Sequence, residues 1–322
     1  MSNKIKWGVL GYARIANDSV IPAIVKASNS EFYAIASRKP ESLRECQEKF
    51  HCNKTYESYD LLLADPEVQA VYIPLPNSLH REWTIKAARQ GKHILCEKPL
   101  ALNVVECREM IQECSFHQVK LMEAFMYRYT DRIEKVRKVL ASGVLGDIKY
   151  FNSSFRFLLN LEHDVRMEPE LGGGSLYDVG CYPVNFAGMI TGSVPVSIAA
   201  KAEFQNGVDV LLSSVLQYQN GTIANLNCGF NAYDRVFSEI IGTKGILEIP
   251  DTFSGNSGTI TLTTETGRQE INVVESDRYL LEVEDFADAV INNRQPLFSL
   301  EETIRNMEVI DRLLELIRSQ PH

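Results

Sequence analysis

Several features that define other protein classes are absent from this sequence. It contains no run of about 18 apolar residues, the length that a membrane-spanning helix needs. Its net charge of −9 argues against binding to nucleic acid, because such binding needs a concentrated basic face. The first residues lead into a predicted strand without an apolar leader or a twin-arginine signal, and this predicts a cytoplasmic protein that does not bind membranes.

Cysteine and histidine spacings typical of disulfide frameworks and metal sites are also absent. The seven cysteines are odd in number and form no C-x-x-C pair, and the six histidines form no H-x-x-x-H pair. This pattern is typical of reduced thiols in a cytosol, and no metal site is predicted. With 322 residues, 45% of them hydrophobic, the chain can form two ordinary domains, each with a full core.

Residues 1–123 alternate predicted strands with predicted helices, which indicates a Rossmann-type domain with a parallel, doubly wound sheet. Ligands of such sheets bind at the carboxyl ends of the strands. Pro22 lies inside one predicted helix and is expected to break or kink it. The predicted strands are 4–10, 32–37, 70–73, 92–96 and 120–123, and the predicted helices are 14–28, 40–50, 79–90 and 104–117.

Residues 124–322 have a different pattern, with long strands joined by tight turns. Asn206-Gly207 and Asn220-Gly221 lie between alternating apolar residues, which is a hairpin signal. We therefore predict an α+β domain with a large, mostly antiparallel open sheet. Its predicted strands are 147–158, 196–206, 208–219, 222–229 and 235–241, and its predicted helices are 132–142, 278–292 and 301–319.

Apolar residues occur on both faces of the predicted hairpin 208–229. A sheet with helices on one face needs a cover for the other face if that face is also apolar. We therefore expect a homodimer, or a dimer of dimers, formed through the C-terminal sheet. The residues behind this expectation are Val208, Val210, Leu211, Leu212, Val215 and Leu216.

The turn after the first strand reads Gly11-Tyr12-Ala13-Arg14-Ile15-Ala16. A dinucleotide-binding turn has the pattern G-x-G-x-x-G/A, in which the second glycine lets the backbone approach the pyrophosphate. Gly11 and Ala16 fit this pattern, whereas Ala13 departs from it and should weaken the phosphate contact. Taken alone, the turn fits an ordinary strand–turn–helix equally well.

The second strand ends at Ser37-Arg38-Lys39, where an NAD-selective site usually carries an acidic residue. A guanidinium can hold a phosphate through paired hydrogen bonds and stack on adenine. We therefore expect NADP(H) to be preferred, with NAD(H) possible. The alternative is a solvated basic turn before a helix.

Three further motifs follow in a fixed order along the chain. Pro74-Leu75-Pro76-Asn77 ends the third strand, and Glu97-Lys98-Pro99 ends the next one. Gly172-Gly173-Gly174 precedes Asp178 and Tyr182. An ammonium group beside a phenol favours the phenolate, which can take a proton from a hydroxyl while hydride leaves. The glycine run lets the backbone approach a ligand or Lys98, or forms a flexible turn before a helix.

In this order and spacing, these motifs resemble the glucose–fructose oxidoreductase and inositol dehydrogenase family (Gfo/Idh/MocA). A tyrosine stands at position 182, where many members have histidine, and this is similar to the dihydrodiol and NADP-dependent D-xylose dehydrogenase branch. The resemblance implies a catalytic Lys98 and Tyr182, with Asp178 on the same helical face aiming the lysine. It implies that cofactor is bound by Gly11, Ala13, Arg14, Ile15, Ser37, Arg38, Leu75, Asn77, His80, Glu97, Lys98 and Arg128, and substrate by Asp164, Arg166 and Tyr182.

The expected activity is hydride transfer between a nicotinamide and a CH–OH group of a sugar, polyol or cyclic diol. Asn77 has an alternative role as a helix cap, Tyr182 as a core residue, and the two arginines and Asp164 as surface ion pairs. Two other functions stay open: nucleotide-dependent glycoside cleavage on the same fold, and a non-catalytic NADP sensor.

Overall fold

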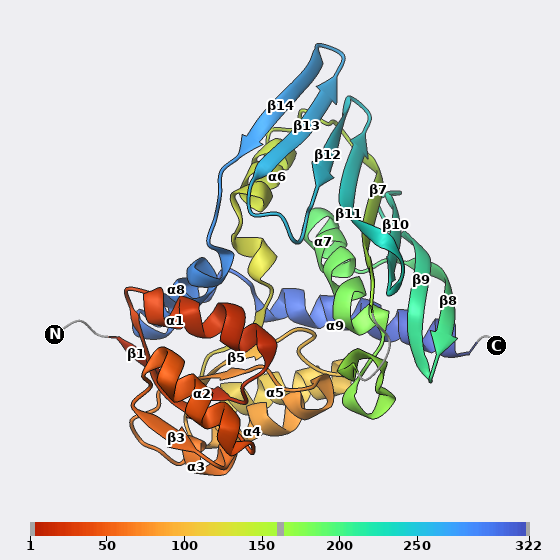
Figure 1. The fold of residues 1–322 in the computed structure, drawn as a ribbon. Coiled ribbons are helices and arrows are strands. Elements are labelled where there is room, and N and C mark those ends of the chain that lie inside the picture. Colours follow the sequence, from red (N-terminus) through yellow and green to blue (C-terminus); the bar gives the residue numbers. More distant parts are fainter. Residues whose placement is uncertain (1–3, 160–163, 320–322) are drawn as a thin grey trace. The chain divides into compact units, whose positions relative to one another are not determined.

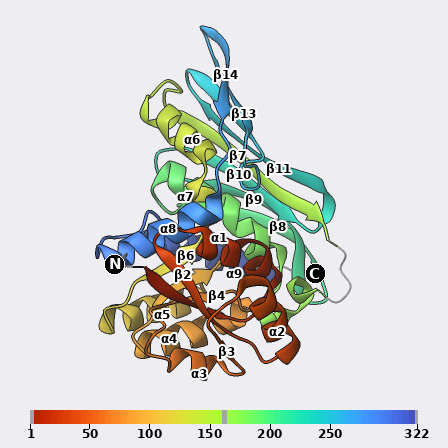
Figure 2. The same cartoon turned by 60° about the vertical axis from the view of Figure 1, so that its left-hand side comes forward.

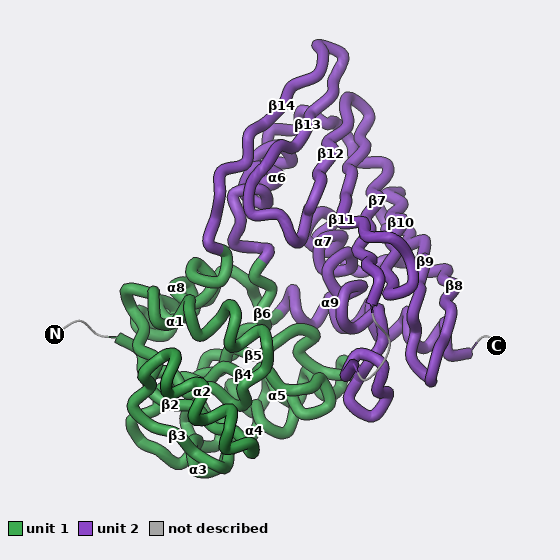
Figure 3. Tube along the Cα trace, in the orientation of Figure 1, with its two compact units in different colours: residues 1–126, 278–300 green, residues 127–277, 301–322 purple. Residues whose placement is uncertain are grey.

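The computed structural model describes residues 4–159 and 164–319, and it groups the chain into two compact units. The first unit comprises Met1–Met126 and Arg278–Leu300, and the second comprises Tyr127–Asp277 and Glu301–His322 (Figure 3). The sequence prediction assigned residues 278–300 to the C-terminal domain, whereas the structure groups them with the N-terminal part. The predicted domain boundary at residues 123 and 124 stays a prediction, since compactness alone does not define an independently folding domain.

A parallel sheet of six strands forms the centre of the first unit (Figure 1). The strand order is β3-β2-β1-β4-β5-β6, the order of a dinucleotide-binding fold, so the predicted α/β class is confirmed. The strands are β1 Ile5–Leu10, β2 Ser30–Ala36, β3 Lys54–Tyr56, β4 Ala70–Ile73, β5 His93–Glu97 and β6 Leu121–Ala124. The helices are α1 Ile21–Lys26, α2 Pro40–Phe50, α3 Tyr59–Leu63, α4 His80–Arg89, α5 Val104–Phe116 and α8 Arg278–Ile291.

Pro22 changes the helix predicted at 14–28 in the way that its missing N–H group requires. Residues 14 and 15 are α-helical, Ala16–Val20 form a π-helix, and α1 continues the helix from Ile21. The N–H group of Ile21 donates to the carbonyl of Ala16, five residues back. Proline lacks the N–H group that a regular helix uses, and the π-helix with its wider turn ends directly before Ile21 and Pro22.

Helix α8 closes the core of the first unit, although it lies far from β1 in the sequence. The ring of Phe286 packs on the ring of Trp7 with centroids 5.5 Å apart, and both residues are buried. The indole N–H of Trp7 donates to Ser30 Oγ at 3.0 Å, so the buried polar atom of this large side chain is satisfied. Helix α8 also packs against α1.

The second unit is built on an eight-stranded sheet with the order β14-β13-β12-β11-β7-β10-β9-β8 (Figure 2). All pairings are antiparallel except that of β7 with β10, which confirms the predicted α+β architecture. The strands are β7 Ile148–Leu158, β8 Ser197–Gln205, β9 Val208–Gln217, β10 Ile223–Gly229, β11 Asn231–Gly242, β12 Gly245–Pro250, β13 Gly258–Thr264 and β14 Gly267–Val273.

Helices cover the inner face of this sheet, with α7 packed against β7 and β10. The predicted turn at Asn206-Gly207 joins β8 to β9, and both residues have positive φ, as an Asn-Gly hairpin turn requires. The helices of the second unit are α6 Asp131–Ala141, α7 Cys181–Thr191 and α9 Leu300–Arg318, with the 3₁₀ turns η3 Met126–Tyr129, η4 Val165–Met167 and η5 Pro169–Leu171 and the π-helix η6 Leu176–Gly180. The first unit also contains the π-helix η1 Ala16–Val20 and the 3₁₀ turn η2 Asn77–Leu79. No helix in the described ranges is long and apolar enough to span a membrane.

The outer face of β9 is less apolar than the sequence pattern suggested. Of the six apolar residues behind the expected dimer, four are buried: Val208, Val210, Leu212 and Leu216. Leu211 and Val215 alternate with them and point outward beside Ser213 and Gln217. Apolar residues therefore occur on both faces of this strand, with fewer on the outer face, and the dimer stays a prediction.

Candidate functional site

The turn after β1 is tight enough to require glycine. Gly11 has a φ of +102°, and its N–H group donates to the carbonyl of Ala36 at 2.8 Å. An added Cβ would lie 3.1 Å from Leu75 Cδ2. Ala13 and Ile15 are half-buried and Arg14 is exposed. The two predicted contacts Gly11 and Leu75 therefore meet at this turn, which has the cramped backbone that a dinucleotide-binding turn needs.

The end of β2 presents two cations and a hydroxyl group. Ser37 is buried, and its Oγ accepts the N–H group of Lys39 at 3.1 Å. The side chains of Arg38 and Lys39 are exposed. No carboxylate occurs from residue 37 to 39, so an incoming 2′-phosphate would meet no like charge from this segment.

His80 ties the loop after β4 to the loop after β5. Its ring is fully buried, with Nε2 2.8 Å from the carbonyl of Leu75 and Nδ1 2.9 Å from that of Pro99. Burial is the main cause of the lowered pKa of this imidazole, and the charge of Lys98 adds to it. Both ring nitrogens thus face backbone carbonyls, and the contact of His80 with cofactor stays a prediction. Asn77 lies half-buried in η2, just before this ring.

Glu97 and Lys98 stand at the carboxyl end of β5, with a buried acid cluster beside them. The hydroxyl of Tyr72 donates to Glu97 Oε1 at 2.6 Å, and the N–H group of Lys98 contacts Glu97 Oε2 at 3.3 Å. From α8, Glu282 is 1% exposed, and its Oε1 has no partner among the described residues. Burial first, and Glu97 second, raise the pKa of the Glu282 carboxyl well above its ordinary value. Sequence reasoning missed Tyr72 and Glu282.

In the second unit, Arg166 is bound between the two predicted carboxylates. Its Nε donates to Asp178 Oδ2 at 2.6 Å, and its Nη1 contacts both oxygens of Asp164 at 3.1 and 3.2 Å. Burial lowers the pKa of Arg166, but the charges of Asp178 and Asp164 more than offset this, so the pKa is raised. These three predicted residues thus form one partly buried ion cluster with a fixed geometry.

Tyr182 lies in the first turn of α7 and packs in an aromatic cluster. It is 5% exposed, and its ring contacts those of Tyr127, Phe155 and Phe253 with centroids 5.3 to 5.8 Å apart. Asp178 lies in the preceding π-helix η6, so the expected regular helical turn between the two residues is widened. Such packing fixes the direction of the phenol ring. Lys98 belongs to the first unit, and the predicted Lys98–Tyr182 pair stays a prediction.

Arg128 connects three elements of the second unit. It is 4% exposed, with Nη1 donating to Asn185 Oδ1 at 3.1 Å and Nη2 donating to Glu302 Oε1 at 2.7 Å. Tyr127 also donates its hydroxyl to Asn185 Oδ1, at 2.5 Å. These bonds hold η3, α7 and α9 together. Arg128 therefore has a structural role in joining these helices, which the sequence did not reveal. Its predicted contact with cofactor stays a prediction.

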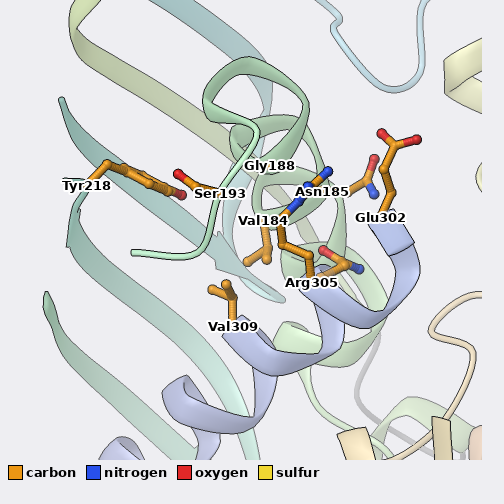
Figure 4. A pocket seen from close by; sticks show the side chains of 9 residues that line it. Val184, Asn185, Gly188, Ser193, Tyr218, Glu302, Arg305 and Val309 are labelled. Carbon is orange, nitrogen blue, oxygen red and sulfur yellow. The ribbon is translucent and has the colours of Figure 1, made fainter. Parts of the chain in front are cut away.

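A small pocket lies between α7 and α9 (Figure 4). Asn185 and Glu302, the two partners of Arg128, are part of its lining. None of the predicted catalytic or substrate-binding residues lines it. It is a feature of the helix packing behind Arg128, separate from the ion cluster of Asp178.

Comparison with known proteins identifies the class to which this site belongs. The model of the oxidoreductase family with an NAD-binding Rossmann fold matches residues 5–125, and the model of the GFO/IDH/MocA C-terminal domain matches residues 133–248. The chain belongs to the GFO/IDH/MocA family of oxidoreductases, which confirms both the predicted family and the predicted enzyme class.

Individual relatives cover nearly all of the chain. D-xylose 1-dehydrogenase (NADP(+)) 2 of Haloferax volcanii is 38% identical over 315 residues, 96% of each chain. Trans-1,2-dihydrobenzene-1,2-diol dehydrogenase of Xenopus tropicalis is 35% identical over 248 residues, 76% of this chain and 75% of that protein. The solved structure of KijD10, a 3-ketoreductase from Actinomadura kijaniata in complex with NADP and TDP-benzene, superposes with a TM-score of 0.93 at 29% identity and covers 98% of both chains.

Proposed function

We propose that the protein is an NADP-dependent oxidoreductase that transfers hydride between the nicotinamide and a CH–OH carbon of a sugar, polyol or cyclic diol. One observation carries the proposal: Lys98 directly follows β5, at the carboxyl edge of a sheet with the dinucleotide-binding strand order. The relatives named above support the substrate class, since they are named as dehydrogenases of D-xylose and of a dihydrobenzene diol.

The proposed chemistry separates the two hydrogens of the substrate alcohol. When bound, the nicotinamide supplies the hydride acceptor for the C–H hydrogen. Tyr182 takes the hydroxyl proton, and the Lys98 ammonium favours the ionised phenol that accepts it. The oxygen then forms the carbonyl double bond. In solved structures of KijD10 a lysine and a tyrosine have been replaced. The two residues are as many positions apart in that sequence as Lys98 and Tyr182 are in this one.

Arg166 and Asp178 would orient the substrate beside this pair. Their ion cluster with Asp164 is fixed at three points, and the side chain of Arg166 remains 30% exposed. An exposed guanidinium edge can donate to substrate oxygens while its other N–H groups stay bound to carboxylates. The same reaction read in reverse reduces a ketone, with Tyr182 returning the proton.

The preference for NADP rests on the end of β2. Ser37 and Arg38 would hold the 2′-phosphate, while Gly11, Ala13 and Ile15 would form the turn under the pyrophosphate. Arg38→Asp is expected to weaken NADPH binding and to strengthen NADH binding, because a carboxylate repels the phosphate and accepts ribose hydroxyls. Binding titrations of both nucleotides test this, with Arg44→Asp on α2 as the matched control. An unchanged ratio of the two affinities would show that Arg38 does not select the nucleotide.

The activity itself is tested by following nicotinamide absorbance with purified protein, NADP and a panel of pentoses, hexoses, polyols and vicinal diols. We expect turnover with at least one alcohol and its loss in Lys98→Ala. Lys86→Ala is the matched control, because this lysine forms surface ion pairs on α4. Turnover that survives Lys98→Ala would contradict the assigned role.

Two outcomes of the same assay would point elsewhere. Cleavage of aryl glycosides with no net change in nicotinamide absorbance would indicate nucleotide-dependent glycoside hydrolysis. Tight NADPH binding without any turnover would indicate a sensor. Both outcomes use the same bound nucleotide, so the absorbance record and the product analysis together separate them from the proposed dehydrogenase.

We also propose that the protein works in the cytoplasm as a homodimer or a dimer of dimers, formed through the outer face of the C-terminal sheet. Tyr150, Val215 and Ile246 on β7, β9 and β12 are 49%, 46% and 36% exposed, which leaves apolar surface for a partner. None of the seven cysteines forms a disulfide in the described chain, which suits a reducing compartment. A monomer in light scattering at micromolar concentration would contradict the dimer.

A further inference from the structure

One buried carboxylate outside the predicted site holds the segment that carries Asp178 and Tyr182. Asp209 lies on β9 and is 3% exposed. Its Oδ2 accepts the hydroxyl of Ser175 and the N–H group of Leu176, both at 2.7 Å. These two donors lie at the start of η6, so the carboxylate caps the helical segment in which Asp178 lies.

The glycine before this segment is shaped to the same carboxylate. Gly174 has a φ of +120°, and a Cβ added there would lie 2.3 Å from Asp209 Oδ1. No side chain larger than glycine fits, because the obstructing atom belongs to a short, buried side chain. The turn and the carboxylate therefore determine one another's position.

The backbone of Gly174 is hydrogen-bonded to both partners of the ion pair between Arg166 and Asp178. Its N–H group donates to the carbonyl of Arg166 at 2.9 Å, and its carbonyl accepts the N–H group of Asp178 at 3.1 Å. The backbone atoms on either side of the Arg166–Asp178 ion pair thus bond to Gly174, the residue directly before the two donors to Asp209. A shift of the capped turn would move both partners of the pair.

The other end of the segment rests on the neighbouring strand. A Cβ added at Gly180 would lie 2.8 Å from Cys228 Sγ on β10, and 2.9 Å from Leu176 Cδ1. The π-helix therefore contacts β9 through the hydrogen bonds to Asp209. It packs closely on β10 because Gly180 has no side chain. Tyr182 follows two residues later, in the first turn of α7.

We propose that Asp209 is a positioning residue, which sets the placement of Arg166, Asp178 and Tyr182 by capping η6 from the sheet. This inference rests on the proposed function of those three residues. Asp209 is buried and acts only through Ser175, Leu176 and Gly174. Misplacing reacting groups by about 1 Å can reduce turnover about 100-fold, so loss of the cap should appear mainly in kcat.

Three variants test the proposal in the full-length protein with NADPH. Asp209→Asn removes the charge with little change of shape, and Ser175→Ala removes one of the two bonds. Ser238→Ala is the matched control, because this serine is also fully buried and hydrogen-bonded, at 2.8 Å to Ser153 and 3.0 Å to Thr252 on the same sheet. Neither of these two hydrogen bonds involves a residue of η6.

We expect Asp209→Asn to lower kcat about 10- to 100-fold, with a smaller rise in KM, and Ser175→Ala to lower kcat about 3- to 10-fold. The control should stay within about twofold, and NADPH should bind all three variants as it binds the wild type. Equal kcat in Asp209→Asn and Ser238→Ala would overturn the proposal. If Asp209→Asn fails to fold, Ser175→Ala with unchanged kcat would overturn it.

Hydrogen exchange gives a readout that needs no substrate. The amides of residues 176–180 should lose protection in Asp209→Asn and keep it in Ser238→Ala, and equal protection in both would overturn the positioning role. If the wild type turned over no alcohol, the proposed function would fail, whereas the exchange result would still decide whether Asp209 holds this segment.

Discussion

Replacing Asp209 by asparagine should change how the stability of the protein depends on pH. The pKa of this carboxyl is raised to about 6 from its ordinary value of 3.8. Burial is the main cause, and the bonds from Ser175 and Leu176 offset only part of it. The folded protein therefore keeps a proton on Asp209 at pH values where the unfolded chain has already released it.

The sign and size of the effect follow from linkage. Below pH 3.8 the carboxyl is protonated in both states and has no effect on the free energy of unfolding. Between pH 3.8 and about 6 only the folded state holds the proton, so stability falls as the pH rises, and above about 6 the loss is constant. The difference between the two pKa values corresponds to about 3 kcal/mol. Asparagine does not titrate, so this loss is absent in the variant.

Urea unfolding followed by circular dichroism at several pH values from 4 to 7 tests this reasoning. The free energy of unfolding of Asp209→Asn, minus that of the wild type, should rise by up to about 3 kcal/mol across this range. The same difference for Ser238→Ala should stay constant. A difference for Asp209→Asn that is flat, or that falls with pH, would mean that the two hydrogen bonds outweigh the cost of burial.

Three further substitutions have expected outcomes. Gly180→Ala should lower the free energy of unfolding by about 1–3 kcal/mol, because the new methyl group meets Cys228 Sγ at 2.8 Å; unchanged urea unfolding would refute this. Arg166→Gln should lower turnover while NADPH affinity stays the same, because Asp178 loses the partner 2.6 Å away; equal losses of both would contradict a substrate-side role. Phe286→Ala should cost about 3–5 kcal/mol, because this ring is fully buried in the first unit, and a smaller loss in thermal unfolding would indicate that the site collapses around the cavity.

The alternation of strands and helices allowed the sequence to predict the first sheet. Its strands are buried on both faces, so they appear as short apolar runs between helices, a pattern that few other folds share. β3 was missed because three residues with exposed or half-buried side chains leave no such run. The return of residues 278–300 to the first unit was also missed, because the apolar stripe of α8 does not specify which core it joins. The packing of Phe286 on Trp7 and of α8 on α1 reveals it.

The second sheet was predicted only as far as residue 241. Its last three strands, β12, β13 and β14, were missed, although each begins with a glycine and β13 alternates between threonine and apolar residues. β14 is largely exposed and rich in polar residues, so it resembles a loop by composition. Its pairing with β13 is a long-range property of the sheet that local patterns do not contain.

Asp209 escaped prediction because strand periodicity placed it on the wrong face. Strict alternation from Leu211 and Ser213 puts residue 209 on the outer side, where an aspartate needs no explanation. The structure instead shifts the register between Glu203 and Phe204 on β8, and residues 208 to 210 of β9 are all buried. A carboxylate between two valines just after a hairpin turn was the available signal of this bulge.

The glycine run packs closely against other residues of the second unit. The sequence suggested that Gly172 to Gly174 either let the backbone approach a ligand or Lys98, or form a flexible turn before a helix. In the structure a Cβ at Gly173 would lie 2.5 Å from the carbonyl of Arg166, and one at Gly174 would lie 2.3 Å from Asp209 Oδ1. The obstructing atoms belong to the protein itself, so these glycines permit close internal packing. Because that packing fixes the ion cluster of Arg166 and Asp178, we infer that the motif marks a rigid support for the segment that carries Asp178.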